Sequence, residues 1–211
     1  MLMRPPSGKI PLALKLVYLL WMAIWVPVYW VFNGPGNFLW LCDMANIILL
    51  FALCLESSLL MSAQAAGVLL IQFVWLLDFL SAVFFGTHLT GGTEYMFDSE
   101  QPPWLRALSL FHLVIPPLLL WGVHRLGYDP RGWKLQTLIA WVLLPASFLL
   151  TDPALNINWV WQPFGVALPL LPPWTVLLFM MLAYPVVVVL PTHLLLSHWF
   201  RPVDASRSAA M

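Results

Sequence analysis

Residues 58–86 read SLLMSAQAAGVLLIQFVWLLDFLSAVFFG, and this stretch decides the fold class. A helix needs about 20 apolar residues to cross the hydrocarbon core of a bilayer. The run exceeds that length, and Asp78 is its only charged residue. We expect either one tilted helix or two pieces broken near Gly67. In both cases the stretch predicts a membrane-spanning segment.

Composition extends this prediction to the whole chain. The 211 residues are 62% hydrophobic and 9% charged, whereas a soluble domain carries roughly 25% charged residues. We therefore predict an all-α fold, a polytopic transmembrane bundle of about six helices that forms a single domain over 1–211 and ends in a short polar tail, 199–211. A seventh span is the alternative if 58–86 is broken. The apolar runs place the spans near 11–32, 38–55, 58–86, 104–124, 135–151 and 174–198.

The basic residues indicate the orientation of the bundle. Six spans put both termini on one side, and basic residues are retained on the cytoplasmic side. That side would hold Arg4, Lys9, Lys15, Arg125, Arg131, Lys134, Arg201 and Arg207. Only Arg106 falls on the other side, where the loop 87–103 is acidic. We expect both termini to be cytoplasmic, the first helix to be retained rather than cleaved, and the protein to lie in a bacterial inner membrane. The net charge is zero and no basic patch is present, so nucleic-acid binding is not expected.

Polar residues inside the spans are the functional clue. A charged side chain inside the bilayer costs about 2.5–3.5 kcal/mol, so it usually faces a partner, water or a ligand. Counted from the predicted helix ends, the polar groups gather in the outer half of the membrane. They are Cys42, Asp43, Asn46, Gln72, Asp78 and His112, joined by Asn156 and Asn158 from an outer loop. The inner half is comparatively bare, with Gln64, His193 and His198.

A thiol, an imidazole and carboxylates at one depth are the components of a Cys/His nucleophilic site. His112 would take the proton from Cys42, and Asp78 or Asp43 would orient the imidazole. Asn156 or Asn158 would stabilise an oxyanion, and Asn46 and Gln72 would contact the substrate. Each residue also has a purely structural interpretation: cysteine is a small apolar side chain in many helices, and buried polar groups often join helices by hydrogen bonds. The two cysteines lie on one predicted helix, too far apart for a disulfide.

Three short segments carry a family resemblance. Leu39-Trp40-Leu41-Cys42-Asp43-Met44-Ala45, then Phe111-His112, then Asn156-Ile157-Asn158-Trp159 ahead of Pro163 resemble the YwaF-type bacterial membrane proteins. Mammalian relatives of that family include a cysteine-dependent acyltransferase of ether phospholipids. The resemblance covers roughly 38–163 and implies acyl transfer by Cys42 and His112. The chain differs from the family pattern at Trp40, where the family has His, and in lacking a Tyr after the Asn.

Three functions from different classes follow. The first is a membrane-bound cysteine-dependent acyltransferase acting on a membrane lipid, and a transition-metal site formed by its Cys, His and Asp residues is a variant of it. The second is a proton-coupled small transporter, in which Asp78 and His112 exchange protons. The third is a non-catalytic membrane assembly protein. We expect no cofactor, because the chain has no phosphate loop and no zinc signature. The oligomeric state is not indicated.

Overall fold

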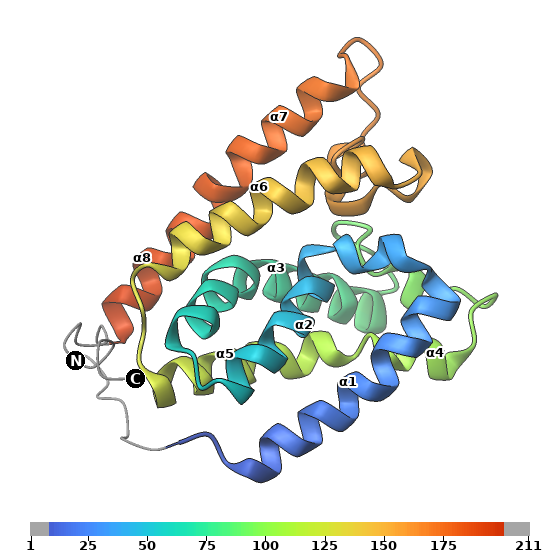
Figure 1. The fold of residues 1–211 in the computed structure, drawn as a ribbon. Helices are drawn as coiled ribbons and strands as arrows, with labels where there is room; N and C mark the ends of the chain where they lie inside the picture. Colours follow the sequence, from blue (N-terminus) through green and yellow to red (C-terminus); the bar gives the residue numbers. More distant parts are fainter. Residues whose placement is uncertain (1–8, 201–211) are drawn as a thin grey trace.

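The computed structural model describes residues 9–200, and these residues form an all-α bundle (Figure 1). The α-helices are α1 (Leu12–Asn33), α2 (Leu41–Cys54), α3 (Ser58–Phe85), α4 (Pro103–Leu108), α5 (Phe111–Leu126), α6 (Gly132–Leu150), α7 (Pro173–Ala183) and α8 (Leu190–Trp199). The short 3-10 helices are η1 (Pro35–Leu39), η2 (Glu94–Met96), η3 (Pro153–Leu155), η4 (Ile157–Trp159) and η5 (Pro163–Gly165). A π-helical segment, η6 (Tyr184–Val189), joins α7 to α8. The predicted basic residues Arg4, Arg201 and Arg207 lie outside the described residues, as does most of the predicted tail.

Within the described part of the chain, five helical stretches are long and apolar enough to cross a membrane. They are α1, α3, the α4–α5 stretch Pro103–Leu126, α6, and the α7–η6–α8 stretch Pro173–Trp199. Helix α2 is apolar but shorter than these five. Helix α3 continues through Gly67 without a break, so 58–86 contributes one span rather than two. The protein is an integral membrane protein with a polytopic all-α fold, as predicted.

Helix α2 is shorter than the predicted span 38–55. Its 14 residues rise about 21 Å, less than the roughly 30 Å hydrocarbon core. The preceding residues adopt η1 instead, because Pro35 follows Gly34, whose left-handed φ of 78° ends α1. Trp40 is extended and supplies no side-chain cap, so the start of α2 depends on a partner from elsewhere in the chain.

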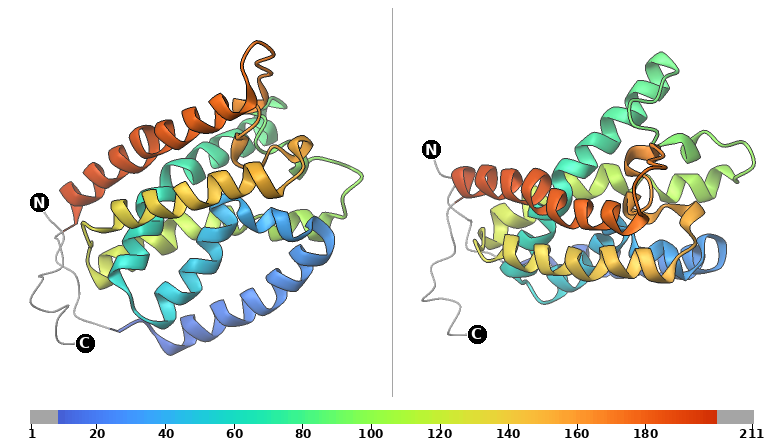
Figure 2. Two further views of the ribbon diagram at one scale, coloured as in Figure 1. Left: turned by 45° about the horizontal axis from the view of Figure 1, so that its top comes forward. Right: turned by 90° about the horizontal axis from the view of Figure 1, so that it is seen from above.

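Helix α3 is the centre of the bundle and packs against α2, α5, α6 and α8. Residues 61–68 are buried on every side, and most of them are small. Small residues allow helix backbones to approach closely in a membrane. A Cβ added at Gly132, the first residue of α6, would lie 2.8 Å from the backbone nitrogen of Ala63. In contrast, the outer end of α3 extends beyond its neighbours (Figure 2). Phe84 and Phe85 at this end are exposed.

Both ends of the described chain lie beside the loop that joins α5 to α6. Arg125 donates a hydrogen bond to the carbonyl of Lys9, and the ring of Phe200 lies 6.4 Å from that of His124. The two ends of the described chain therefore lie at the same end of the bundle, which requires an even number of passes between them. The same end carries the Lys15–Glu56 ion pair, with 2.6 Å between Nζ and Oε1. We call it the inner end, because the predicted orientation places it in the cytoplasm, and we call the opposite end the outer end.

Candidate functional site

Cys42 and Asp43 lie in the first turn of α2. Asp43 is buried, and its carboxylate accepts a 2.5 Å hydrogen bond from the Asn37 amide of η1. The partly buried thiol of Cys42 donates to the other Asp43 oxygen over 3.9 Å, a weak contact. The structure therefore joins two of the predicted catalytic residues to each other.

His112 has different partners. Its Nδ1 is hydrogen-bonded to the Gln72 amide oxygen, so α5 is joined to α3 at this point. The imidazole is stacked between Trp75 and Phe111, with ring centroids 4.4 Å and 4.2 Å away. The amide nitrogen of Gln72 is buried without a hydrogen-bond partner in the described structure. Among the described residues no hydrogen bond links His112 to Cys42, so the predicted nucleophile–base pair is not formed here.

Asp78 organises the loop that follows α3. One carboxylate oxygen accepts a hydrogen bond from the Thr90 backbone at 2.5 Å, and the other accepts from the backbone and the hydroxyl of Thr93 at 3.0 and 2.5 Å. His88 Nδ1 also lies 3.3 Å from this second oxygen. Asp78 is fully buried. The imidazole beside Asp78 is thus that of His88, a residue that the sequence interpretation did not select.

The predicted asparagines hold backbone segments. Asn158 accepts from the Leu41 backbone nitrogen at 3.0 Å and donates to the Leu39 carbonyl at 2.8 Å, so it caps the start of α2 from the distant 156–165 loop. Asn156 accepts from the Trp161 and Gln162 nitrogens and fixes the turn of that same loop. Asn46 accepts from the Tyr18 hydroxyl and joins α2 to α1.

The inner half is not bare, contrary to expectation. Gln64 donates to Gln136 at 3.1 Å, Gln136 donates to the Tyr184 hydroxyl at 3.0 Å, and that hydroxyl donates to the Gly67 carbonyl. This chain of hydrogen bonds joins α3, α6 and η6. Gln136 lies one turn inside α6 and within the predicted span 135–151, so it is a polar residue of the membrane region that the sequence interpretation did not count.

Aromatic hydroxyls also join segments near the outer end. Tyr29 of α1 is hydrogen-bonded to Ser109 at 2.7 Å, and Trp75 of α3 donates to the Tyr95 hydroxyl at 3.3 Å. Tyr95 belongs to η2, outside the spanning helices, and burial raises its pKa. The sequence interpretation did not select these residues. Tyr29 had a signal in its position near a predicted span end, but tyrosines are common there for other reasons. Tyr95, in the middle of the loop 87–103, had none.

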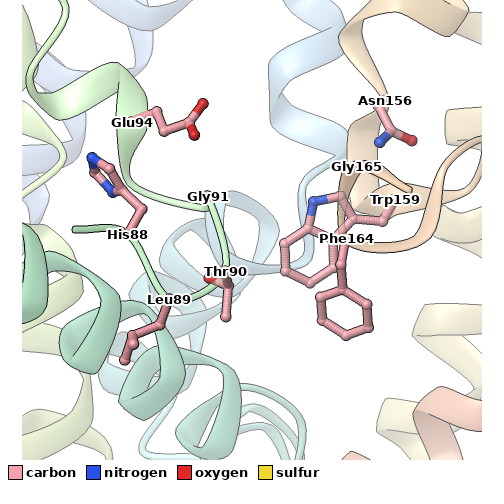
Figure 3. Close-up of a pocket in the computed structure, with 9 residues that line it drawn as sticks. All are labelled: His88, Leu89, Thr90, Gly91, Glu94, Asn156, Trp159, Phe164 and Gly165. Carbon is pink, nitrogen blue, oxygen red and sulfur yellow. The ribbon is translucent and has the colours of Figure 1, made fainter. Parts of the chain in front are cut away.

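An open cleft of about 650 Å³ lies where two outer loops meet (Figure 3). We call residues 88–94 the first wall and residues 156–165 the second wall. The lining residues are His88, Leu89, Thr90, Gly91, Glu94, Asn156, Trp159, Phe164 and Gly165. Figure 3 shows the Glu94 carboxylate extending from the first wall, the rings of Trp159 and Phe164 together on the second, and the His88 ring turned away from the second.

The second wall has an unusual backbone. Four non-glycine residues in it have left-handed φ angles: Asn156 (44°), Asn158 (54°), Trp159 (55°) and Phe164 (51°). Asparagine tolerates this conformation, but a bulky side chain there is an outlier. Trp159 and Phe164 are therefore held in an unfavourable conformation, and both line the cleft.

Two further findings concern the chemistry and the relatives of the chain. Among residues 9–200, no group of three or more His, Cys, Asp and Glu side chains could hold a metal ion, so the residues of the metal variant do not converge. Comparison with family models, curated proteins and solved structures finds no match.

Proposed function

We propose that this integral membrane protein works by binding a ligand in the cleft between its two outer loops. The observation that carries the proposal is the conformation of Trp159 and Phe164. A residue held in a sparsely populated backbone region costs about 1–3 kcal/mol and persists only when its surroundings impose it. Such residues are concentrated at binding and catalytic sites, and here the two bulky ones both line the cleft.

Both walls of the cleft are irregular in structure and yet firmly tethered. Asp78 ties the first wall to α3 through Thr90 and Thr93. Asn158 ties the second wall to the start of α2. Binding then requires little further ordering of the loops, which is a main contribution of preorganisation to affinity. The charge pattern supports placing the cleft on the outer face of a bacterial inner membrane, since the basic residues are concentrated at the opposite end of the bundle.

The test is to identify what binds to the cleft. The protein is purified from its membrane in mild detergent, and its bound small molecules and lipids are measured by native mass spectrometry. We expect a bound species that Phe164→Gly removes. Glycine adopts the left-handed conformation without strain, so this variant should keep the fold. Trp199→Leu, at an exposed tryptophan of the inner end, is the matched control and should retain the species. Identical spectra for the wild type and Phe164→Gly would refute the proposal.

A second candidate keeps the acyl transfer that the family resemblance implies, with Asp43 instead of His112 beside the nucleophile. The supporting observation is the contact between the Cys42 thiol and the Asp43 carboxylate. The thiol proton would pass to the Asp43 carboxylate, the Cys42 thiolate would attack the acyl ester to form a thioester as the ester C–O bond breaks, and Asp43 would return the proton to the departing lysophospholipid. Incubation with a phospholipid carrying a labelled acyl chain would therefore leave a hydroxylamine-sensitive label on Cys42. Cys42→Ser would lose that label and Cys54→Ser would keep it. Equal labelling of the two variants, or none of the wild type, would reject this candidate.

A further inference from the structure

We propose that the ligand of the outer cleft carries an organic ammonium group, which Glu94 and the Trp159–Phe164 pair bind from opposite walls. This inference rests on the proposed function of the cleft and names its ligand class. Three observations carry it: the charge of the lining, the geometry of the aromatic pair and the surface beside the second wall.

The lining carries a net negative charge. Glu94 is its only formally charged residue, and no Lys or Arg lines the cleft. Glu94 is exposed and makes no ion pair within the described structure. The lining imidazole, that of His88, is directed at Asp78 and Thr93. An anionic ligand would find no charged partner in this cleft, whereas an ammonium group would pair with the Glu94 carboxylate.

The second wall supplies an aromatic surface opposite that carboxylate. The ring centroids of Trp159 and Phe164 lie 4.6 Å apart with an interplanar angle of 40°, so the two rings pack against each other in a tilted arrangement. The face of an aromatic ring attracts a cation, worth about 0.5–1 kcal/mol at an exposed site and about 2 when water is excluded. Gly91 and Gly92 lie on the opposing wall, and a Cβ at Gly92 would be 3.9 Å from the Trp159 ring. Glycine at position 92 therefore lets the first wall approach the indole closely, with room for no more than a methyl group at that point.

The surface beside the second wall is apolar and exposed. The chain continues from Phe164 into Val166, Leu168, Leu170 and Leu171, and Leu170 is 94% exposed. An apolar loop at the outer end of a membrane bundle would enter the lipid interface. The cleft would then open at the level of the headgroups. The ammonium group could belong to a zwitterionic phospholipid headgroup or to a free amine such as choline, and the cleft volume of about 650 Å³ admits either.

The experiment measures binding to the full chain in detergent by microscale thermophoresis. The probes are choline, ethanolamine, and short-chain phosphatidylcholine, phosphatidylethanolamine and phosphatidylglycerol below their micellar concentrations. We expect the ammonium probes to bind and phosphatidylglycerol to bind at least tenfold more weakly. Glu94→Gln should weaken ammonium binding about tenfold and Phe164→Leu about threefold. Glu100→Gln, which changes an exposed carboxylate in the same outer connection, should have no effect.

The outcomes separate this inference from the proposal beneath it. If the zwitterionic lipids bind and free choline competes only at far higher concentration, the source is a lipid headgroup; if choline binds as tightly as the lipids, the source is a free amine. Both results support the inference. Binding of phosphatidylglycerol that depends on Phe164 but not on Glu94 would overturn the ammonium assignment and leave the cleft as a binding site. If no probe binds and native mass spectrometry shows no cleft-dependent species, both proposals fail.

Discussion

Replacing Asp78 by Ala should loosen the first wall of the cleft without unfolding the bundle. In the native structure the carboxylate accepts two backbone N–H groups and one hydroxyl, and it lies beside His88. Alanine removes all of these acceptors. Thr93 is fully buried, so its N–H would be left without a partner, whereas the partly exposed Thr90 can turn to water.

The magnitude follows from these contacts. A hydrogen bond to a charged group contributes about 1.5–3 kcal/mol, and a buried unsatisfied donor costs about 1–3 kcal/mol. Some relaxation of the loop is expected, so we predict a local destabilisation of about 3–4 kcal/mol for Asp78→Ala. Asp78→Asn keeps one acceptor oxygen but turns an NH₂ group toward a donor, and it should cost about 2 kcal/mol.

The assay is hydrogen–deuterium exchange in detergent, followed by peptide over residues 87–97. Since 1.4 kcal/mol corresponds to a tenfold change in an equilibrium constant, amide exchange at Thr90 and Thr93 should accelerate about 100- to 1000-fold in Asp78→Ala. Peptides from α6 should be unchanged, because the loss is local. Glu100→Ala is the matched control and should exchange like the wild type. Unchanged exchange over 87–97 in Asp78→Ala would refute the assignment of Asp78 as the clamp of the first wall.

Three further changes test the packing of the bundle. Asn158→Ala should lower the local stability by about 2–3 kcal/mol, because it removes the cap on the Leu41 nitrogen and the hydrogen bonds to Leu39 and Ser147. Faster amide hydrogen exchange confined to the first turn of α2 would confirm this prediction. Gly132→Ala should lower the melting temperature more than Gly122→Ala does. The new methyl group at position 132 meets the α3 backbone, whereas the one at position 122 meets the flexible side chain of Met61. Equal decreases in melting temperature would contradict the close approach of α6 to α3. Asp129→Asn should cost about 1 kcal/mol at neutral pH. Burial raises the pKa of Asp129, but the hydrogen bonds and charge of Arg131 outweigh it and hold that pKa below its usual range. The stabilisation by the Asp129 carboxylate is therefore complete well above the ordinary aspartate pKa of about 3.9, and it declines as the pH falls through the lowered pKa. The difference in melting temperature between wild type and Asp129→Asn should accordingly shrink in acid. A difference that does not change with pH would contradict this prediction.

Hydrophobicity was sufficient to predict the fold. Length and apolar composition placed six passes, and these properties act locally along the chain, independent of packing. The start of α2 was misplaced because it depends on Asn158, which is more than a hundred residues away. The sequence alone could not show whether α3 is continuous or broken at Gly67, because glycine is compatible with both. The packing of α6 against α3 at Gly67 determines that the helix is continuous.

The site was harder to predict, because membrane depth is readable from sequence but helix rotation is not. Gln72 and His112 were placed in one layer, and the structure brings them into contact. Asp78 was placed at that depth too, yet its partners come from the loop that folds back over it. His88 and Glu94 were overlooked because they lie outside the spans, where a polar residue carries no desolvation cost and gives no signal.

The most direct test of the account is the side of the membrane from which the cleft can be reached. In a Cys42→Ser/Cys54→Ser background, Glu94→Cys and Lys134→Cys are treated in intact cells with a membrane-impermeant maleimide. Both positions are exposed at opposite ends of the bundle. The account predicts that Glu94→Cys is labelled at once and that Lys134→Cys is labelled only after permeabilisation. The reverse pattern, or equal labelling of both before permeabilisation, would contradict an outward-facing cleft.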